Sequence, residues 1–375
     1  MEKVNNDYRD YFPVTQTHVY LNHAATAPVS KPLMQNVTQF MTDSIIGNQG
    51  EQRWIEYTEK VRHLAAALIH VDADEIALVN NVSTGAMLIA NGLSFKKGDE
   101  ILVPKNQFPA NVYPWTNLQQ KGVRVITEEL PHASHAIDVL ESRVSDKTRL
   151  LCLSFVEYDD GYRHAIEEIG RLCRKNNVLF FVDAVQGLGA LPLDARKAEI
   201  DFLATSGHKW LLGPSGQGFL YVRRERLQDL YVLSKGWLSN TLPFEFQNYR
   251  QPIKATAGRF EGGTWNFLGI AGLGAALNLL HKVGIDRIEH HIFQLSDLLR
   301  KELSQRGYQI AGSSSRNERS GITAFRHESV PASDIFSRLL EQRIIVSERN
   351  DHIRVSPHFY NNEDDIKKLL AILPV

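Results

Sequence analysis

The feature that most constrains the fold of this chain is a series of short apolar runs between residues 75 and 223. Most of these runs are continuously apolar rather than alternating. Continuous runs are typical of strands in a sheet that is covered on both faces. The predicted strands are Ile76–Val79, Glu100–Val103, Val123–Ile126, Leu150–Phe155, Val178–Val182, Phe202–Thr205 and Gly218–Val222.

Amphipathic segments lie between several of these strands. They predict helices over Thr84–Leu93, Pro109–Gln120 and His164–Asn176. Alternation of strands and helices favours an α/β fold with a largely parallel sheet. After Gly307 the pattern changes to shorter strands and helices, which predicts a smaller α+β domain. We therefore expect a large domain over residues 21–281 and a small domain made of residues 1–20 and 282–375.

Composition excludes several classes of partner. The formal net charge of -1 offers no concentrated basic surface, so neither nucleic acid nor a membrane surface is expected as a partner. No apolar run reaches membrane-spanning length, and the charged N-terminal residues lack the apolar core of a signal peptide. The expected compartment is the cytoplasm.

Cysteine and histidine usage gives no sign of a disulfide or a metal site. The two cysteines lie in apolar patterns: Cys152 in a predicted strand, and Cys173 at helical spacing from Ile169. We expect both to be small core residues. His132 and His135 lie in a polar loop without matching acidic or cysteine ligands, so no metal is predicted.

Chemistry is expected where the strands end, because open parallel sheets bind ligands beyond the carboxyl ends of their strands. Ser83 and Thr84 follow the first strand and open a helix, which is the pattern of an anion site or of an ordinary N-cap. Asp183 ends another strand, where a buried carboxylate needs a cation or donors. Lys209 follows a third strand in apolar surroundings, where desolvation favours the neutral, nucleophilic amine.

Three motifs carry a resemblance to a known family. They are Val182-Asp183-Ala184-Val185-Gln186, Ser206-Gly207-His208-Lys209 leading into Gly213-Pro214-Ser215-Gly216, and Phe260-Glu261-Gly262-Gly263-Thr264. In order and spacing the chain resembles the class V aminotransferase family of fold-type-I pyridoxal-phosphate enzymes. This family includes cysteine desulfurases, selenocysteine lyases, isopenicillin-N-epimerase-like proteins and kynureninases. The resemblance extends from residues 20–25 to residues 354–361.

The resemblance implies pyridoxal 5′-phosphate as cofactor, a homodimer with shared active sites, and a role for each matching residue. Lys209 resembles the lysine that holds the cofactor as a Schiff base and removes the α-proton. Asp183 would keep the pyridine nitrogen protonated, Gln186 would hydrogen-bond the ring hydroxyl, and Phe108 would stack on the ring. Tyr158 departs from the family pattern, but its hydroxyl would still be able to donate to the ring hydroxyl. The predicted phosphate ligands are Ser83, Thr84, Ser206, His208 and, from the neighbouring subunit, Thr264. The predicted substrate ligands are Arg354 for the carboxylate, with Asn22 and His23 at the mouth, although His23 fits a structural turn equally well.

The chain departs from cysteine desulfurases at three points. Residues 344–350 contain no cysteine to accept sulfur, and Phe108 stands where desulfurases stack a histidine. Tyr158 likewise replaces an asparagine, and Glu157 and Asp159 beside it either face the substrate or are solvated loop acids. We therefore expect transamination or β-elimination of the C–S or C–Se type. A selenocysteine lyase or desulfurase with a thiol elsewhere, an amino-acid epimerase, and a non-catalytic binding protein are the alternatives.

Overall fold

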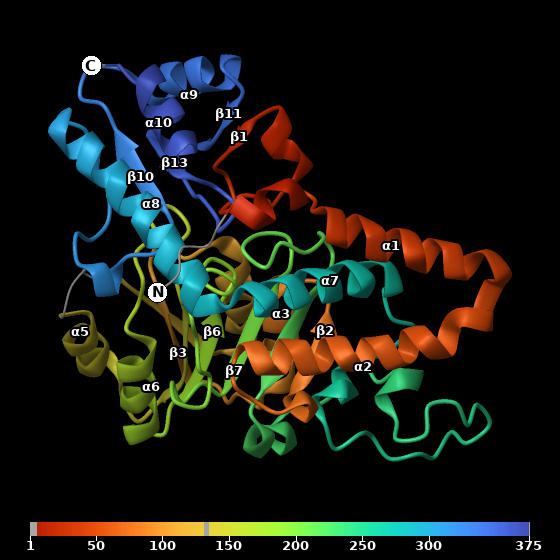
Figure 1. The fold of residues 1–375 in the computed structure, drawn as a ribbon. Coiled ribbons are helices and arrows are strands. Elements are labelled where there is room, and N and C mark those ends of the chain that lie inside the picture. The colour runs from red at the N-terminus through yellow and green to blue at the C-terminus, as the bar shows by residue number, and fades with distance from the viewer. Residues whose placement is uncertain (1–5, 131–134, 375) are drawn as a thin grey trace.

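The computed structural model describes residues 6–130 and 135–374 (Figure 1). Residues 1–5 of the predicted small domain and His132 therefore lie outside the described residues. A large α/β body occupies the lower part of Figure 1, and the C-terminal elements form a smaller body above it.

A seven-stranded sheet forms the centre of the large body, in the order β2-β8-β7-β6-β5-β3-β4. Only β8 runs against its neighbours, pairing antiparallel with both β2 and β7. The prediction of a largely parallel sheet is confirmed, and every predicted strand is present. Their bounds are β2 Ile76–Val79, β3 Glu100–Pro104, β4 Arg124–Glu128, β5 Thr148–Ser154, β6 Leu179–Asp183, β7 Phe202–Ser206 and β8 Gly218–Val222.

Both faces of the sheet are covered, which explains the continuous apolar runs. Phe180 and Val182 of β6 belong to one core cluster, whereas Phe181 between them belongs to another. Because successive side chains point to opposite faces, a strand buried on both faces must be apolar throughout. Helices α2 (Glu51–Leu68), α6 (Ile166–Lys175) and α7 (Phe267–Val283) contribute to the first cluster, and α3 (Val82–Gly92) and α4 (Tyr113–Thr116) to the second.

The predicted helix over 109–120 is wrong as a single element. This segment is a 3-10 turn at Pro109–Asn111, the four-residue α4, and a second 3-10 turn at Asn117–Lys121. Pro114 stands in the middle of the segment, and proline lacks the N–H that a continuous helix needs. Conversely, α1 (Lys31–Asp43), α2 and α5 (His135–Arg143) have no counterpart among the predicted elements.

The small body contains a four-stranded antiparallel sheet in the order β12-β13-β10-β9. Val19 and Leu21 from the N-terminal segment belong to its core cluster. Helix α8 connects the two bodies, because Ile288 and Ile292 pack in the large core whereas Leu299 packs in the small one. The domain boundary at residue 282 therefore stays a prediction. The remaining bounds are β1 Val19–Tyr20, α8 Ile285–Gln305, β9 Gln309–Ile310, β10 Thr323–Arg326, α9 Ala332–Glu341, β11 Ile344–Ile345, β12 Ser347–Arg349, β13 His352–Val355 and α10 Glu363–Ile372.

Cys152 and Cys173 are both free and buried, as predicted. No single helix among the described residues is long and apolar enough to cross a membrane, although α7 and α8 pass that test when taken together, with a bend of 79° between them.

Candidate active site

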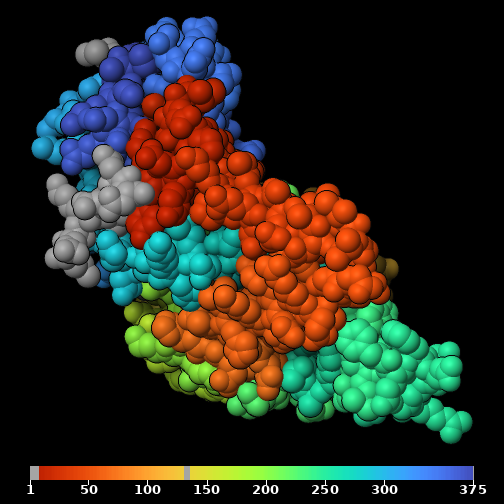
Figure 2. All heavy atoms as spheres, turned by 45° about the vertical axis from the view of Figure 1, so that its right-hand side comes forward, coloured from red at the N-terminus to blue at the C-terminus, as the bar shows by residue number. Residues whose placement is uncertain are grey.

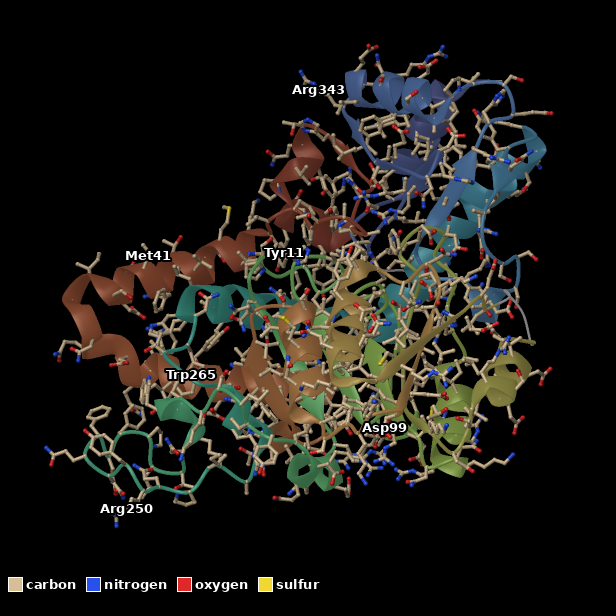
Figure 3. All side chains as sticks on the ribbon, turned by 180° about the vertical axis from the view of Figure 1, so that it is seen from behind. Tyr11, Met41, Asp99, Arg250, Trp265 and Arg343 are labelled. Atoms are coloured by element: carbon tan, nitrogen blue, oxygen red, sulfur yellow. The ribbon has the colours of Figure 1, made fainter. Side chains whose placement is uncertain are left out.

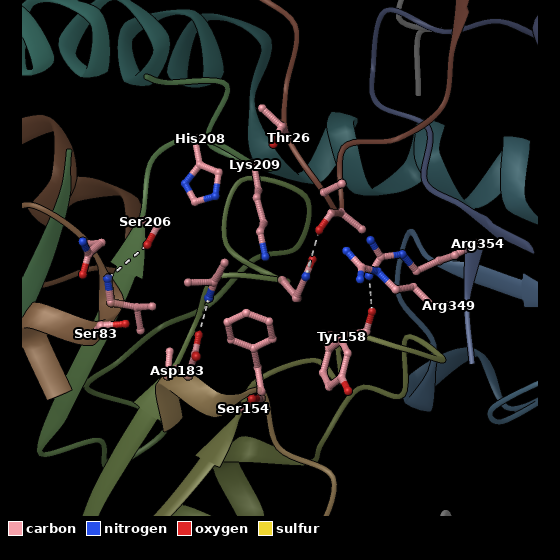
Figure 4. Close-up of a pocket in the computed structure, with 18 residues that line it drawn as sticks. Thr26, Ser83, Ser154, Tyr158, Asp183, Ser206, His208, Lys209, Arg349 and Arg354 are labelled. Atoms are coloured by element: carbon pink, nitrogen blue, oxygen red, sulfur yellow. Dashed lines mark hydrogen bonds between the residues drawn. The ribbon is translucent and has the colours of Figure 1, made fainter. Parts of the chain in front are cut away.

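A cavity of about 410 Å³ opens at the carboxyl edge of the central sheet (Figure 4). Asp183 and Ser206 are the last residues of the parallel neighbours β6 and β7, so both reach this edge. The cavity brings together nine of the predicted site residues: Ser83, Phe108, Tyr158, Asp183, Gln186, Ser206, His208, Lys209 and Arg354.

Lys209 projects into the cavity from the loop after β7. Burial lowers the pKa of its amine to about 8, and the positive charges of Arg354 and Arg349 add to this effect, whereas Asp183 opposes it. The Nζ atom lies 5.3 Å from the centre of the Phe108 ring. The neutral, nucleophilic form of this amine is therefore more populated near neutral pH than in an ordinary lysine.

Asp183 is buried at the floor of the same cavity. Burial raises the pKa of its carboxyl to about 6, against the hydrogen bond from the Val185 N–H and the charge of Lys209. That bond, from Val185 N to Oδ1, is 2.9 Å long. A carboxylate in such a position is stabilised by a cationic partner in the cavity, and a protonated pyridine nitrogen meets this need.

The N-terminal end of α3 forms one end of the cavity. Asn81 caps the helix by accepting from the Thr84 N–H at 2.9 Å, and Ser206 Oγ accepts from the Val82 N–H at 3.0 Å. Ser83 and His208 line the cavity beside them. Hydroxyl groups at a helix N-terminus, with an imidazole nearby, suit a phosphate.

Thr84 and Thr264 lie elsewhere. The Thr84 hydroxyl donates to Asn81 Oδ1 at 3.2 Å, so it completes the helix cap. Both threonines line a separate hollow of about 180 Å³. The structure therefore does not bring them into the cavity of their own chain.

Gln186 is held between two protein groups. Its Nε2 donates to the Ala24 carbonyl at 3.0 Å, and its Oε1 accepts from Trp210 Nε1 at 3.0 Å. These bonds orient the amide where it lines the cavity.

Arg354 forms the other end of the cavity, opposite Ser206 and His208 (Figure 4). It is only 1% exposed, its Nε donates to Ser347 Oγ at 3.1 Å, and its Nη1 donates to the Tyr158 carbonyl. Burial lowers the pKa of the guanidinium to about 10. A fixed guanidinium with free donors suits a substrate carboxylate.

His23 and Asn22 do not line the cavity. His23 is buried, with Nδ1 2.8 Å from the Ser356 carbonyl and Nε2 2.9 Å from the Tyr360 hydroxyl. Asn22 forms a bridge to Ser356. The hydrogen bonds give His23 a structural role, and the prediction that Asn22 binds the substrate stays a prediction, while the next residues of the segment, 24–26, do line the cavity.

Neither acid beside Tyr158 lines the cavity, and Glu157 is buried whereas Asp159 is half-buried in the loop. Glu157 is buried, bonded to Gln107 Nε2 at 2.5 Å and to His164 Nε2 at 2.7 Å, and does not line the cavity. Asp159 lines a neighbouring hollow. In contrast, Arg349 lines the cavity and was not predicted. The sequence feature that pointed to this region is the pair Asn350-Asp351 directly after it, because such residues form the tight turn of a hairpin.

The chain is similar over nearly its whole length to known proteins. Residues 19–369 match the model of the family Aminotransferase class-V. An uncharacterized aminotransferase, YcbU, from Bacillus subtilis is 29% identical over 98% of this chain and 96% of its own. A probable cysteine desulfurase from Methanothermobacter thermautotrophicus is 28% identical over 97% of this chain and 96% of its own.

Solved structures of pyridoxal-phosphate enzymes also resemble this chain. The cystine C–S lyase C-DES, in complex with its reaction product cysteine persulfide, is 27% identical, with a TM-score of 0.89 over 96% of this chain and 98% of its own. A C-DES variant that carries glycine covalently linked to its PLP cofactor aligns with a TM-score of 0.90, at 27% identity over 97% of this chain and 98% of its own. The matched residues span nearly the whole chain, and the cavity lies at the carboxyl edge of the sheet. The chain therefore belongs to the class V aminotransferase family.

Proposed function

We propose that this chain is a pyridoxal 5′-phosphate enzyme that removes the α-proton of an amino acid and then eliminates its β-substituent. The observation that carries the proposal is the convergence of Lys209, Asp183 and Arg354 in one cavity. Ser83, Ser206 and His208 would hold the phosphate, Asp183 the pyridine nitrogen, and Lys209 the aldehyde carbon. When bound, this coenzyme supplies an electron sink for the charge that develops at the α-carbon.

The residues of the chain position the substrate and move its proton. Arg354 binds the α-carboxylate. Its hydrogen bonds to Ser347 and the Tyr158 carbonyl fix the guanidinium, so that the bound substrate is held in one orientation. Lys209, with a pKa of about 8, is able to accept the α-proton near neutral pH and to return it. Phe108 has no proton to donate, so its ring, which lines the cavity, acts by packing alone.

The cysteines argue for elimination without a protein persulfide. The chain has only Cys152 and Cys173, and burial raises the pKa of both thiols, so neither is a reactive thiolate. A sulfur-containing leaving group would then depart with the product, as in C-DES, whose reaction product is cysteine persulfide. Transamination is the second candidate, because the Bacillus subtilis relative is named an aminotransferase and the same three residues would serve it.

The test begins with the cofactor. Purified or reconstituted protein is expected to be yellow, and Lys209→Ala is expected to lose the visible absorbance of the lysine-bound coenzyme. A panel of amino acids, including cystine, is then incubated with and without a keto-acid acceptor, and the products are identified by mass spectrometry. Keto acid released without an acceptor supports elimination, whereas strict dependence on the acceptor supports transamination. Colourless wild-type protein that cannot be reconstituted would refute the proposal.

We further propose a homodimer and a cytoplasmic location. Residues 231–252 project from the large body, and Figure 2 shows this segment extending beyond it. Phe244 and Phe246 on it are exposed and pack with Trp237, and Arg250 lies at its tip (Figure 3). Exposed apolar clusters of this kind mark association surfaces. The free cysteines suit a reducing compartment.

A further inference from the structure

Arg349 is held at the cavity by a short hairpin. Strands β12 and β13 pair antiparallel, with Arg349 opposite His352, and only Asn350 and Asp351 lie between them. Both of these residues have positive φ angles, 48° and 58°. Two central residues with positive φ form the tight turn that matches the twist of paired strands. The position of Arg349 is therefore set by a defined turn rather than by a long loop.

The register places Arg349 and Arg354 on the same face of this hairpin. Ser347 is opposite Arg354, and Arg349 follows Ser347 by two residues, so all three point to one side. Ile353, on the other side, is buried in the small-domain core. Diagonal neighbours in an antiparallel pair lie about 7–8 Å apart. Figure 4 shows both guanidinium groups entering the same end of the cavity.

Neither of these two cations forms an ion pair with a carboxylate among residues 6–130 and 135–374. Burial lowers the pKa of Arg354 and repulsion from Arg349 adds to this effect, whereas the negative charge of Asp159 only partly opposes it. The coenzyme phosphate has its own donors at the opposite end of the cavity, beside Ser206 and His208. Arg354 is buried and binds the α-carboxylate of the substrate. Arg349 is exposed at the entrance of the cavity, and neither the coenzyme phosphate nor the α-carboxylate pairs with it.

We infer that the substrate is an amino acid with a second acidic group, which Arg349 binds while Arg354 binds the α-carboxylate. This inference rests on the proposed function and narrows its substrate class. The distal group is a carboxylate or an oxyanion of similar size, because the planar guanidinium fork matches such groups. A diagonal spacing of arginines suits two anionic groups separated by a short carbon chain.

The test compares succinate with butyrate, which has the same number of carbons but one carboxylate. Binding of each to the coenzyme-loaded protein is measured by isothermal titration calorimetry, with the thermal midpoint as a second readout. We expect succinate to bind the wild-type protein at least about tenfold more tightly, the value of one good charge-assisted contact. Arg349→Gln is expected to remove this preference and to leave butyrate binding unchanged, whereas Arg349→Lys keeps part of it.

Arg338→Gln is the matched control, because Arg338 is an exposed arginine on α9 outside the cavity; it should leave both ligands unaffected. Equal loss of succinate and butyrate binding in Arg349→Gln would mean that both arginines hold one carboxylate, which overturns the inference. Absence of a succinate preference in the wild type overturns it as well. In either case, coenzyme absorbance that responds to a neutral amino acid such as alanine would leave the proposed function standing, whereas a chain that cannot hold the coenzyme fails both.

Discussion

At the scale of single residues, the site depends on opposed electrostatic effects around Lys209. Burial and two arginines lower the pKa of its amine, and Asp183 raises it. Burial in turn raises the pKa of Asp183. Neither group is held firmly in its charged form, although both are ionisable and lie in one cavity. Such perturbed groups are typical of catalytic sites, because proton transfer near neutral pH requires a pKa near that range.

We predict that Lys209 in coenzyme-free protein reacts with an amine-directed reagent with a midpoint near pH 8. Above this pH the neutral amine predominates; below it the charged amine does not react. Arg349→Gln should move the midpoint upward, because one repelling cation is removed, and Asp183→Asn should move it downward, because the attracting carboxylate is lost. Labelling of Lys209 across a pH series is quantified by peptide mass spectrometry. A midpoint near the usual 10.4 of lysine would contradict the prediction.

At the scale of elements, close helix packing supports the face of the sheet that α7 covers. A Cβ added to Gly274 of α7 would lie 2.5 Å from both Tyr57 Oη and Val61 Cγ2 of α2. His281 Nε2 lies 2.9 Å from the Leu64 carbonyl of α2, and Asn36 Nδ2 of α1 donates to the Ala271 carbonyl at 2.7 Å. Gly274 thus allows α7 to approach α2 closely. Helices α1 and α2 are held in place by contacts with α7, which is distant from them in the sequence.

Gly274→Ala is expected to lower the free energy of unfolding by about 1–3 kcal/mol, because the added methyl group overpacks the α2–α7 contact. Asn278→Ala is the control on the same helix, at an exposed position where alanine favours helix formation. Denaturant unfolding of both variants measures the difference. If Gly274→Ala is as stable as Asn278→Ala, α2 and α7 do not pack as closely as described.

At the scale of the whole molecule, exposed apolar side chains gather on two projections. One is the segment 231–252, and the other is the end of the α1–α2 pair, with Met41, Ile45 and Ile46. Figure 2 shows both on the same side of the molecule, and Figure 3 labels Met41 and Arg250 on them. A subunit interface on this side would bury these groups.

We predict that the protein sediments with twice the 42.4 kDa mass of one chain. The double variant Phe244→Ser/Phe246→Ser should shift it toward the monomer, because each substitution removes exposed apolar surface from the proposed interface. Leu340→Ser is the control, since Leu340 is similarly exposed on α9 of the small body. Analytical ultracentrifugation over a range of concentrations provides the measurement, and a wild-type protein that stays monomeric would contradict the proposed homodimer.

Much of the central fold was predictable because it is encoded locally. Strands buried on both faces must be apolar at every position, and most of the seven predicted runs satisfy this condition. All seven became strands, and the exception, β4, lies at the edge of the sheet. Helix α1 was not predicted, and Leu33 is its only buried residue, so this helix contributes little to the core that the sequence pattern marks. The segment 109–120 was predicted as one helix because its apolar spacing outweighed the break at Pro114.

The sequence by itself determined the sheet, the family, and the residues at strand ends that line the cavity, because strand ends and short motifs are local in the chain. Only the tertiary structure decided which other residues join them. It placed His23 among buried hydrogen bonds and Thr84 in the cap of α3, and it turned Arg349 toward Arg354 through strand register. The physical reason is that register and packing depend on partners distant in the sequence, and a single residue of slip would turn a side chain to the opposite face.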